Sequence, residues 1–102
     1  MIYRFVVPGP IEDLEEIRVL EWHRKEGTLV EAGQLLVELE THKAVVEVRP
    51  AETKVLRRFV CREGDWQAIG SPLAYFSDTP DEPLPDVIGE EADILHVEFE
   101  VT

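Results

Sequence analysis

The sequence predicts an all-β fold, a flattened barrel or sandwich of two antiparallel sheets that are related by a quasi-twofold axis. The chain contains two gapless repeats, EWHRKEGTLVEAGQLLVELE from Glu21 and RFVCREGDWQAIGSPLAYFS from Arg58, with an offset of 37 residues. Helix signals are weak, because no apolar pattern with a 3.6-residue period persists over three turns, and prolines and glycines recur throughout. Two repeats are too few for a solenoid, so they favour one pseudo-symmetric domain.

Each repeat predicts a strand, a turn, a short segment and a second strand. The first strands, residues 19–22 and 55–59, are rich in β-branched and aromatic residues. Each is followed by a Lys/Arg-Glu-Gly turn, whose glycine tolerates the positive φ angle that a tight turn often needs. Gly33 and Gly70 mark a second turn in each copy.

The segment before the first repeat has two interpretations. In IEDLEEIRVLEW, the residues Ile11, Leu14 and Ile17 have the spacing of a helix face. Ile17 and Val19, however, also begin an alternating pattern that continues toward Glu21. We therefore expect an acidic loop that leads into a strand.

Between the repeats, residues 35–39 and 45–48 predict two strands that are joined at ETHKA as a β-hairpin. The tip of this hairpin carries Lys43. By the pseudo-symmetry, the chain after Phe76 should turn in the same way at the opposite end. A lysine in a turn is usually a solvated surface residue, so the local sequence leaves a structural and a chemical role open for Lys43.

Composition restricts the classes of function. With 22 Asp and Glu against 10 Lys and Arg, the net charge of -12 disfavours nucleic acid and anionic membranes as partners. The apolar fraction of 44% over 102 residues suits one small core. The only cysteine, Cys61, offers no disulfide or metal spacing, and we interpret it as a small apolar residue. We find no secretion or membrane-spanning pattern and expect a cytoplasmic protein.

The C-terminal part of the chain has a different composition. We divide the chain into a folded domain of residues 1–77, an acidic proline-containing connector of residues 78–93 and a C-terminal strand of residues 94–102. The stretch ILHVEFEV alternates cleanly and predicts an amphipathic strand, with one face formed by Leu95, Val97, Phe99 and Val101. Three placements stay open for it: it folds back on its own domain, pairs with the same strand of a second copy, or docks to a sheet edge of a partner.

Four motifs occur along the chain in this order: VLEWHRKEG, GQLLVELETHKA, FVCREGDWQAIG and PLAYF. With them, residues 2–77 resemble a lipoyl domain of the biotinyl/lipoyl-attachment family, as found in 2-oxo acid dehydrogenase complexes. The resemblance implies that Lys43 carries lipoate through an amide bond. It also implies that the residues flanking the lysine are recognition residues: Glu40, Thr41, His42 and Ala44.

The resemblance implies a carrier component and not an enzyme. The chain would be a free-standing swinging-arm protein that shuttles acyl groups and reducing equivalents between the enzymes of a 2-oxo acid dehydrogenase-like system. Its implied partners are a lipoate ligase or a lipoyl transferase and synthase, an acyl-generating 2-oxo acid dehydrogenase-type enzyme, and dihydrolipoyl dehydrogenase. We expect no catalytic residues and no metal site, because no residue set with the required spacing occurs in the sequence.

One departure from the family pattern lies at the site itself. His42 stands where these domains usually have aspartate, a residue read by the decarboxylase component, so the usual partner is in question more than lipoylation is. An unmodified assembly or regulatory module is therefore an alternative. A biotin carrier for a carboxylase is a weaker alternative, because biotin carriers flank the lysine with methionines and the only methionine here is Met1.

Overall fold

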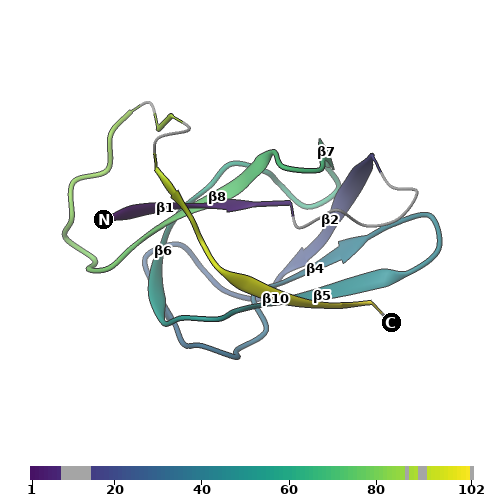
Figure 1. Cartoon of the computed structure of the whole chain (residues 1–102), viewed down its shortest axis with the longest axis horizontal. Helices are drawn as coiled ribbons and strands as arrows, with labels where there is room; N and C mark the ends of the chain where they lie inside the picture. The colour runs from purple at the N-terminus through teal and green to yellow at the C-terminus, as the bar shows by residue number, and fades with distance from the viewer. Residues whose placement is uncertain (8–14, 87, 90–91, 102) are drawn as a thin grey trace.

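The computed structural model describes residues 1–7, 15–86, 88–89 and 92–101, which form ten strands in two five-stranded sheets (Figure 1). These residues include no helix, and therefore none that is long and apolar enough to cross a membrane. The predicted all-β, two-sheet fold is confirmed. Sheet A has the strand order β3 (Leu29–Val30), β6 (Lys54–Phe59), β8 (Pro72–Ser77), β1 (Ile2–Val6) and β9 (Asp93–Ile94). Sheet B has the order β10 (Val97–Val101), β5 (Val45–Pro50), β4 (Val37–Glu40), β2 (Glu16–Trp22) and β7 (Trp66–Ala68).

The quasi-twofold relation that the repeats predict is present as reciprocal contacts between the two copies. Trp22 and Phe59, which are equivalent in the repeat alignment, stack with their ring centroids 4.4 Å apart. The Glu63 carboxylate accepts a hydrogen bond from the Trp22 backbone N–H at 2.9 Å. The Glu26 carboxylate accepts one from the Phe59 backbone N–H at 2.8 Å. Each repeat thus supplies a hydrogen-bond partner to a strand end of the other.

The turn glycines of the two repeats adopt the same backbone conformation. Gly27 and Gly64 have φ angles of 85° and 93°, in a region that residues with side chains disfavour. The Gly27 N–H donates to the carbonyl of Leu56, and the Gly64 N–H donates to the carbonyl of Val19, each at 2.7 Å. The two glycine turns therefore hold each repeat against a strand of the other.

The core lies between the two sheets. Phe5 and Phe76 are fully buried and meet edge to face, with ring centroids 6.5 Å apart. Cys61 is buried among them as a small apolar residue, as predicted, and its burial raises the pKa of the thiol. The other buried members of the core are Val7, Ile17, Val19, Val30, Leu36, Val37, Leu39, Val46, Val48, Leu56, Leu73, Ala74 and Leu95.

The predicted strand boundaries agree with the structure to within a few residues. β2 begins at Glu16, earlier than expected, and residues 11–14 of the alternative helix lie outside the described residues. β4 begins at Val37 and not at Leu35. The Leu35 carbonyl accepts a hydrogen bond from Arg24 Nε at 3.2 Å and so takes no part in a strand ladder.

The C-terminal segment forms two strands, so the single strand predicted for residues 94–102 is wrong. β9 pairs in parallel with β1, whereas β10 pairs antiparallel with β5, and the segment thus crosses from an edge of sheet A to an edge of sheet B. Between the two strands Leu95 is 3% exposed, and its N–H donates to the carbonyl of Arg4 at 2.7 Å. The strand is interrupted because the chain must leave one ladder before it joins the other. We call residues 92–101 the strap; Thr102 lies outside the described residues.

The strap covers the core along only part of its length. Leu95 is buried and Val97 packs against the core, whereas Phe99 and Val101 are exposed although they were expected on the same face as Leu95. In Figure 1 the strap, drawn in yellow, runs from the side of β1 toward the end of the molecule where β4 and β5 are joined. It therefore pairs with edge strands of both sheets within its own chain.

Candidate functional site

The predicted site lies in the turn between β4 and β5, at the end of the molecule opposite to the N-terminus (Figure 1). The Thr41 N–H donates to the Ala44 carbonyl at 2.9 Å and closes the turn. The buried Thr41 hydroxyl oxygen accepts hydrogen bonds from the N–H groups of Lys43 at 3.1 Å and Ala44 at 3.0 Å. One side chain therefore orders the turn from within, while His42 and Lys43 remain exposed.

The three lysines of the chain differ in what surrounds their amines. Within the described residues, no hydrogen bond or ion pair engages the exposed side chain of Lys43. The Lys54 side chain is only 15% exposed, and its ammonium group donates to the Asp78 carboxylate at 2.7 Å and to the Tyr3 hydroxyl at 3.3 Å. The Asp78 hydrogen bond raises the pKa of Lys54, which keeps its amine protonated and unreactive. Lys25 is exposed like Lys43, but it lies beside a glycine turn and not at a hairpin tip.

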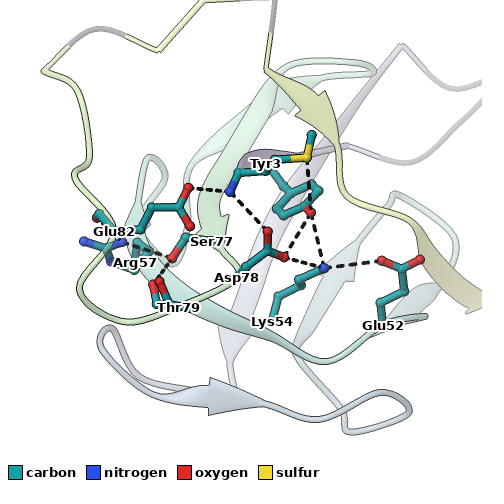
Figure 2. Close-up of polar contacts among 9 residues, drawn as sticks. Tyr3, Glu52, Lys54, Arg57, Ser77, Asp78, Thr79 and Glu82 are labelled. Atoms are coloured by element: carbon teal, nitrogen blue, oxygen red, sulfur yellow. Dashed lines mark hydrogen bonds and ion pairs between the residues drawn. The ribbon is translucent and has the colours of Figure 1, made fainter.

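Figure 2 shows the polar network at the opposite end of the domain, where the chain turns after β8. Asp78 occupies the position of Thr41 one repeat later. The equivalent turn predicted after Phe76 is wrong: in the described residues no following strand returns beside β8, whose neighbours are β6 and β1. Its carboxylate accepts hydrogen bonds from Lys54 at 2.7 Å, from the Tyr3 hydroxyl at 3.0 Å and from the N-terminal ammonium group at 3.1 Å. These donors, the Lys54 ammonium above all, lower the pKa of Asp78 to about 2. The charges at this end therefore neutralise one another and leave no unpaired lysine amine there.

The residues predicted to flank the site contact side chains from two other strands. Glu40 forms an ion pair with Arg18 of β2, and His42 stacks on Trp66 of β7 with ring centroids 5.4 Å apart. Sequence reasoning does not find Arg18 or Trp66, because no local pattern links three strands that only the sheet brings together. The structure thus gathers the predicted residues around Lys43, and their part in recognition stays a prediction.

A second cluster of titratable side chains consists of Glu21, His23 and Glu38, whose ligand atoms lie within 4.8 Å of one another. His23 Nε2 lies 2.6 Å from a carboxylate oxygen of Glu38, and His23 Nδ1 lies 4.0 Å from one of Glu21. Each ring nitrogen therefore faces a different carboxylate. Within this cluster, only His23 and Glu38 are within hydrogen-bond distance of each other, and exposed acidic groups commonly cluster in this way without a metal ion. We interpret the cluster as a hydrogen-bonded bridge between β2 and the adjacent strand β4.

The two-sheet fold, the paired repeats and the lysine at the hairpin tip define a carrier domain of the lipoyl type. A family model described as "Biotin-requiring enzyme", which covers biotin- and lipoyl-attachment domains, matches residues 4–76. The chain therefore belongs to the biotinyl/lipoyl-attachment family. The match ends before the acidic connector and the strap, which lie beyond the family domain.

Curated relatives come from the same family. The dihydrolipoyllysine-residue succinyltransferase component of the 2-oxoglutarate dehydrogenase complex of Staphylococcus saprophyticus is 38% identical over 68 residues, which are 67% of this chain and 16% of that protein. The same component of Bacillus subtilis is 33% identical over 72 residues, which are 71% of this chain and 17% of that protein. The chain thus spans about one-sixth of the length of these relatives.

A solved structure supports the fold assignment. The solution structure of the lipoyl domain of the 2-oxoglutarate dehydrogenase complex from Azotobacter vinelandii superposes with a TM-score of 0.64 and 31% sequence identity. The superposition covers 74% of this chain and 95% of that domain. This chain therefore contains almost the whole of a lipoyl domain, of the type found in 2-oxoglutarate dehydrogenase complexes.

Proposed function

We propose that this protein is a lipoyl carrier, modified with lipoate on Lys43, that shuttles acyl groups and reducing equivalents between the enzymes of a 2-oxo acid dehydrogenase-like system. The observation that carries the proposal is the exposed amine of Lys43, which has no partner among the described residues and stands at the tip of an ordered turn. The relatives support the class of system, because they are components of 2-oxoglutarate and pyruvate dehydrogenase complexes.

The hairpin supplies what acylation of a lysine requires. Another enzyme must reach the amine and meet the same neighbours each time, so the lysine has to be accessible on a rigid support. The hydrogen bonds of Thr41 provide that support, and the exposed Lys43 provides the access. In the modification, Lys43 Nζ attacks the activated carboxyl carbon of lipoate, forms the amide bond and loses a proton, while the activating group leaves.

The bound lipoate supplies the disulfide and dithiol chemistry that carries acyl groups and electrons. The domain contributes presentation and tethering, because an attached carrier meets successive active sites at a high effective concentration. In this proposal catalysis resides in the partners, which are a lipoate ligase or a lipoyl transferase and synthase, an acyl-generating 2-oxo acid dehydrogenase-type enzyme, and dihydrolipoyl dehydrogenase. Action as a free-standing carrier is part of the same proposal.

An unmodified assembly or regulatory module is the second candidate function. It is favoured by His42 in place of the usual aspartate and by the strap, which lies beyond the family match. Biotin attachment is weaker, because His42 and Ala44 flank Lys43 where biotin carriers have methionines.

The deciding experiment is the intact mass of the protein isolated from its own host, followed by peptide mapping. We expect a lipoyl increment on the peptide that contains Lys43, and no increment at Lys25 or Lys54. An unmodified chain, in cells whose other lipoyl proteins are modified, would contradict the carrier function and favour the module. A streptavidin blot of the same sample tests biotin, and we expect no signal.

A further inference from the structure

The turn that carries Lys43 is attached to the β7 edge of sheet B through side chains that the proposed function does not use. Residues 41–44 lie beyond the last ladder pairs on both sides of the hairpin, Arg18 with Glu40 and Val101 with Val46. The hydrogen bonds of Thr41 order the turn internally but make no link to strands other than β4 and β5. A two-stranded ribbon by itself is only marginally stable and twists readily, so the direction of the turn needs a further constraint.

Arg18 and Trp66 lie where they can provide that constraint. Arg18 is the direct cross-strand partner of Glu40 on one side and of Trp66 on the other. Its guanidinium group forms an ion pair with Glu40 and lies 5.8 Å from the centroid of the Trp66 ring, which is a cation–π distance. The base of the hairpin is thereby linked to β2 and β7.

The tip of the hairpin reaches the same tryptophan. The His42 ring lies 5.4 Å from the Trp66 ring, with an angle of 31° between the ring planes, which is an aromatic contact. Trp66 is 42% exposed on an edge strand, where an exposed large apolar side chain is unfavourable unless it makes a contact. The stack with His42 is such a contact, and it joins the residue next to Lys43 to β7, on the other side of β2.

We propose that Trp66 and Arg18 are positioning residues for Lys43: acting through His42 and Glu40, they hold the turn in the orientation that the lipoate-attaching enzyme accepts. This inference rests on the proposed function. It gives His42 a physical role in this chain, since the aspartate usual at that position has no aromatic ring to stack on Trp66.

The role predicts a particular kinetic effect. An enzyme that requires one orientation of the turn binds only the fraction of molecules that adopt it, so loosening the turn raises the apparent KM and leaves kcat unchanged. Trp66→Ala removes the aromatic stack. We expect it to raise the KM for the carrier about threefold to tenfold.

The test uses the full chain as substrate for a lipoate–protein ligase with free lipoate and ATP, and initial rates are measured against carrier concentration. Trp66→Phe keeps an aromatic ring and should stay within about twofold of the unchanged protein. Phe99→Ala is the matched control, because Phe99 is also 42% exposed and lies on the other edge strand of sheet B. We expect no change in KM for this control.

A double-mutant cycle tests whether Trp66 acts through His42. His42→Ala should raise KM by itself, and Trp66→Ala should add little in the His42→Ala background, because the contact is already lost. Fully additive effects would overturn the proposal. Should Trp66→Ala fail to fold, His42→Ala removes the same contact from an exposed turn residue and carries the test.

Backbone relaxation by NMR gives a readout that needs no modification. We expect the order parameters of residues 42–44 to fall in Trp66→Ala and to remain unchanged in Phe99→Ala. Unchanged order parameters in Trp66→Ala would overturn the positioning role. If the ligase rejects the unchanged protein, the proposed function fails, and the relaxation data then decide by themselves whether Trp66 orders the turn.

Discussion

The two ends of this domain carry equivalent positions of the two repeats and differ in their side-chain chemistry. At one end the turn after β4 carries Lys43, whose amine has no partner among the described residues. At the other end the turn after β8 carries Asp78, which pairs with Lys54 at 2.7 Å. Thr41 and Asp78 are equivalent residues of the two repeats, but only Thr41 begins a hairpin turn, because the strand that lies beside β8 in the place of β5 is β1.

The difference teaches that exposure and pairing, and not the turn alone, make a lysine available for acylation. Lys54 is held by a carboxylate and a phenol, and the raised pKa of its amine follows from the Asp78 hydrogen bond. A protonated, immobilised ammonium group is a poor nucleophile. The Lys43 side chain has no such partners among the described residues, and the hydrogen bonds of Thr41 order the turn beneath it.

The largest expected effect comes from Lys43→Arg. This change should abolish lipoylation and all acyl carriage while the melting temperature stays the same, because an exposed turn residue contributes little to stability. Intact mass after incubation with a lipoate ligase and thermal unfolding check the two halves of the prediction. Lys25→Arg is the matched control and should accept lipoate normally. Unfolding of Lys43→Arg would contradict the placement of Lys43 in an exposed hairpin turn.

A second change tests how the strap is anchored to the core. Leu95→Ala removes a buried side chain that anchors the strap, and we expect a loss of about 2 to 5 kcal/mol in the free energy of unfolding. Urea denaturation measures this loss. Ile94→Ala, at a neighbouring residue that is 51% exposed, should change the free energy by no more than about 0.5 kcal/mol. Equal effects of the two changes would mean that the strap is not anchored through Leu95.

A third change tests the order of the lysine turn. Thr41→Val removes the hydroxyl that accepts hydrogen bonds from Lys43 and Ala44, and it leaves two N–H groups without that acceptor. We expect a loss of about 1 to 2 kcal/mol in the free energy of unfolding, together with slower lipoylation. Thr53→Val is the control: its hydroxyl also accepts a backbone hydrogen bond, from Ala32, but in an exposed position where water can replace it. Similar losses for both variants would argue against a special role of Thr41.

The smallest expected effect is a pH dependence of stability that comes from Asp78. The pKa of Asp78 is about 2 in the folded protein and 3.8 in its unperturbed state, so folding favours the ionised carboxylate. Its contribution to stability is fully present above pH 3.8 and is lost as the pH falls toward 2. Melting temperatures of the unchanged protein and of Asp78→Asn should therefore differ at pH 6 and converge near pH 2. A difference that persists unchanged at low pH would assign the effect to something other than this ionisation.

Several features were readable from the sequence because they are local or periodic. The 37-residue offset predicted the paired turns, and the positive φ angles of Gly27 and Gly64 confirm them. The alternation of apolar residues predicted the all-β class, and the hairpin motif placed Lys43 in a turn between β4 and β5. Two predictions were wrong. The single terminal strand came from alternation that continues through Leu95, where the chain changes sheets. The equivalent turn after Phe76 was predicted from the repeat, but β1 and not a following strand pairs with β8.

The sequence by itself thus determined the strand pattern, the two-copy architecture and the position of the hairpin lysine, since each depends on residues that are neighbours or on a regular spacing. Only the tertiary structure decided that Lys54 is engaged by Asp78, 24 residues away, while Lys43 is not. It also decided that Trp66 meets His42 and that the strap joins both sheets. Such contacts depend on strand register and sheet order, which bring together side chains from segments that share no local pattern.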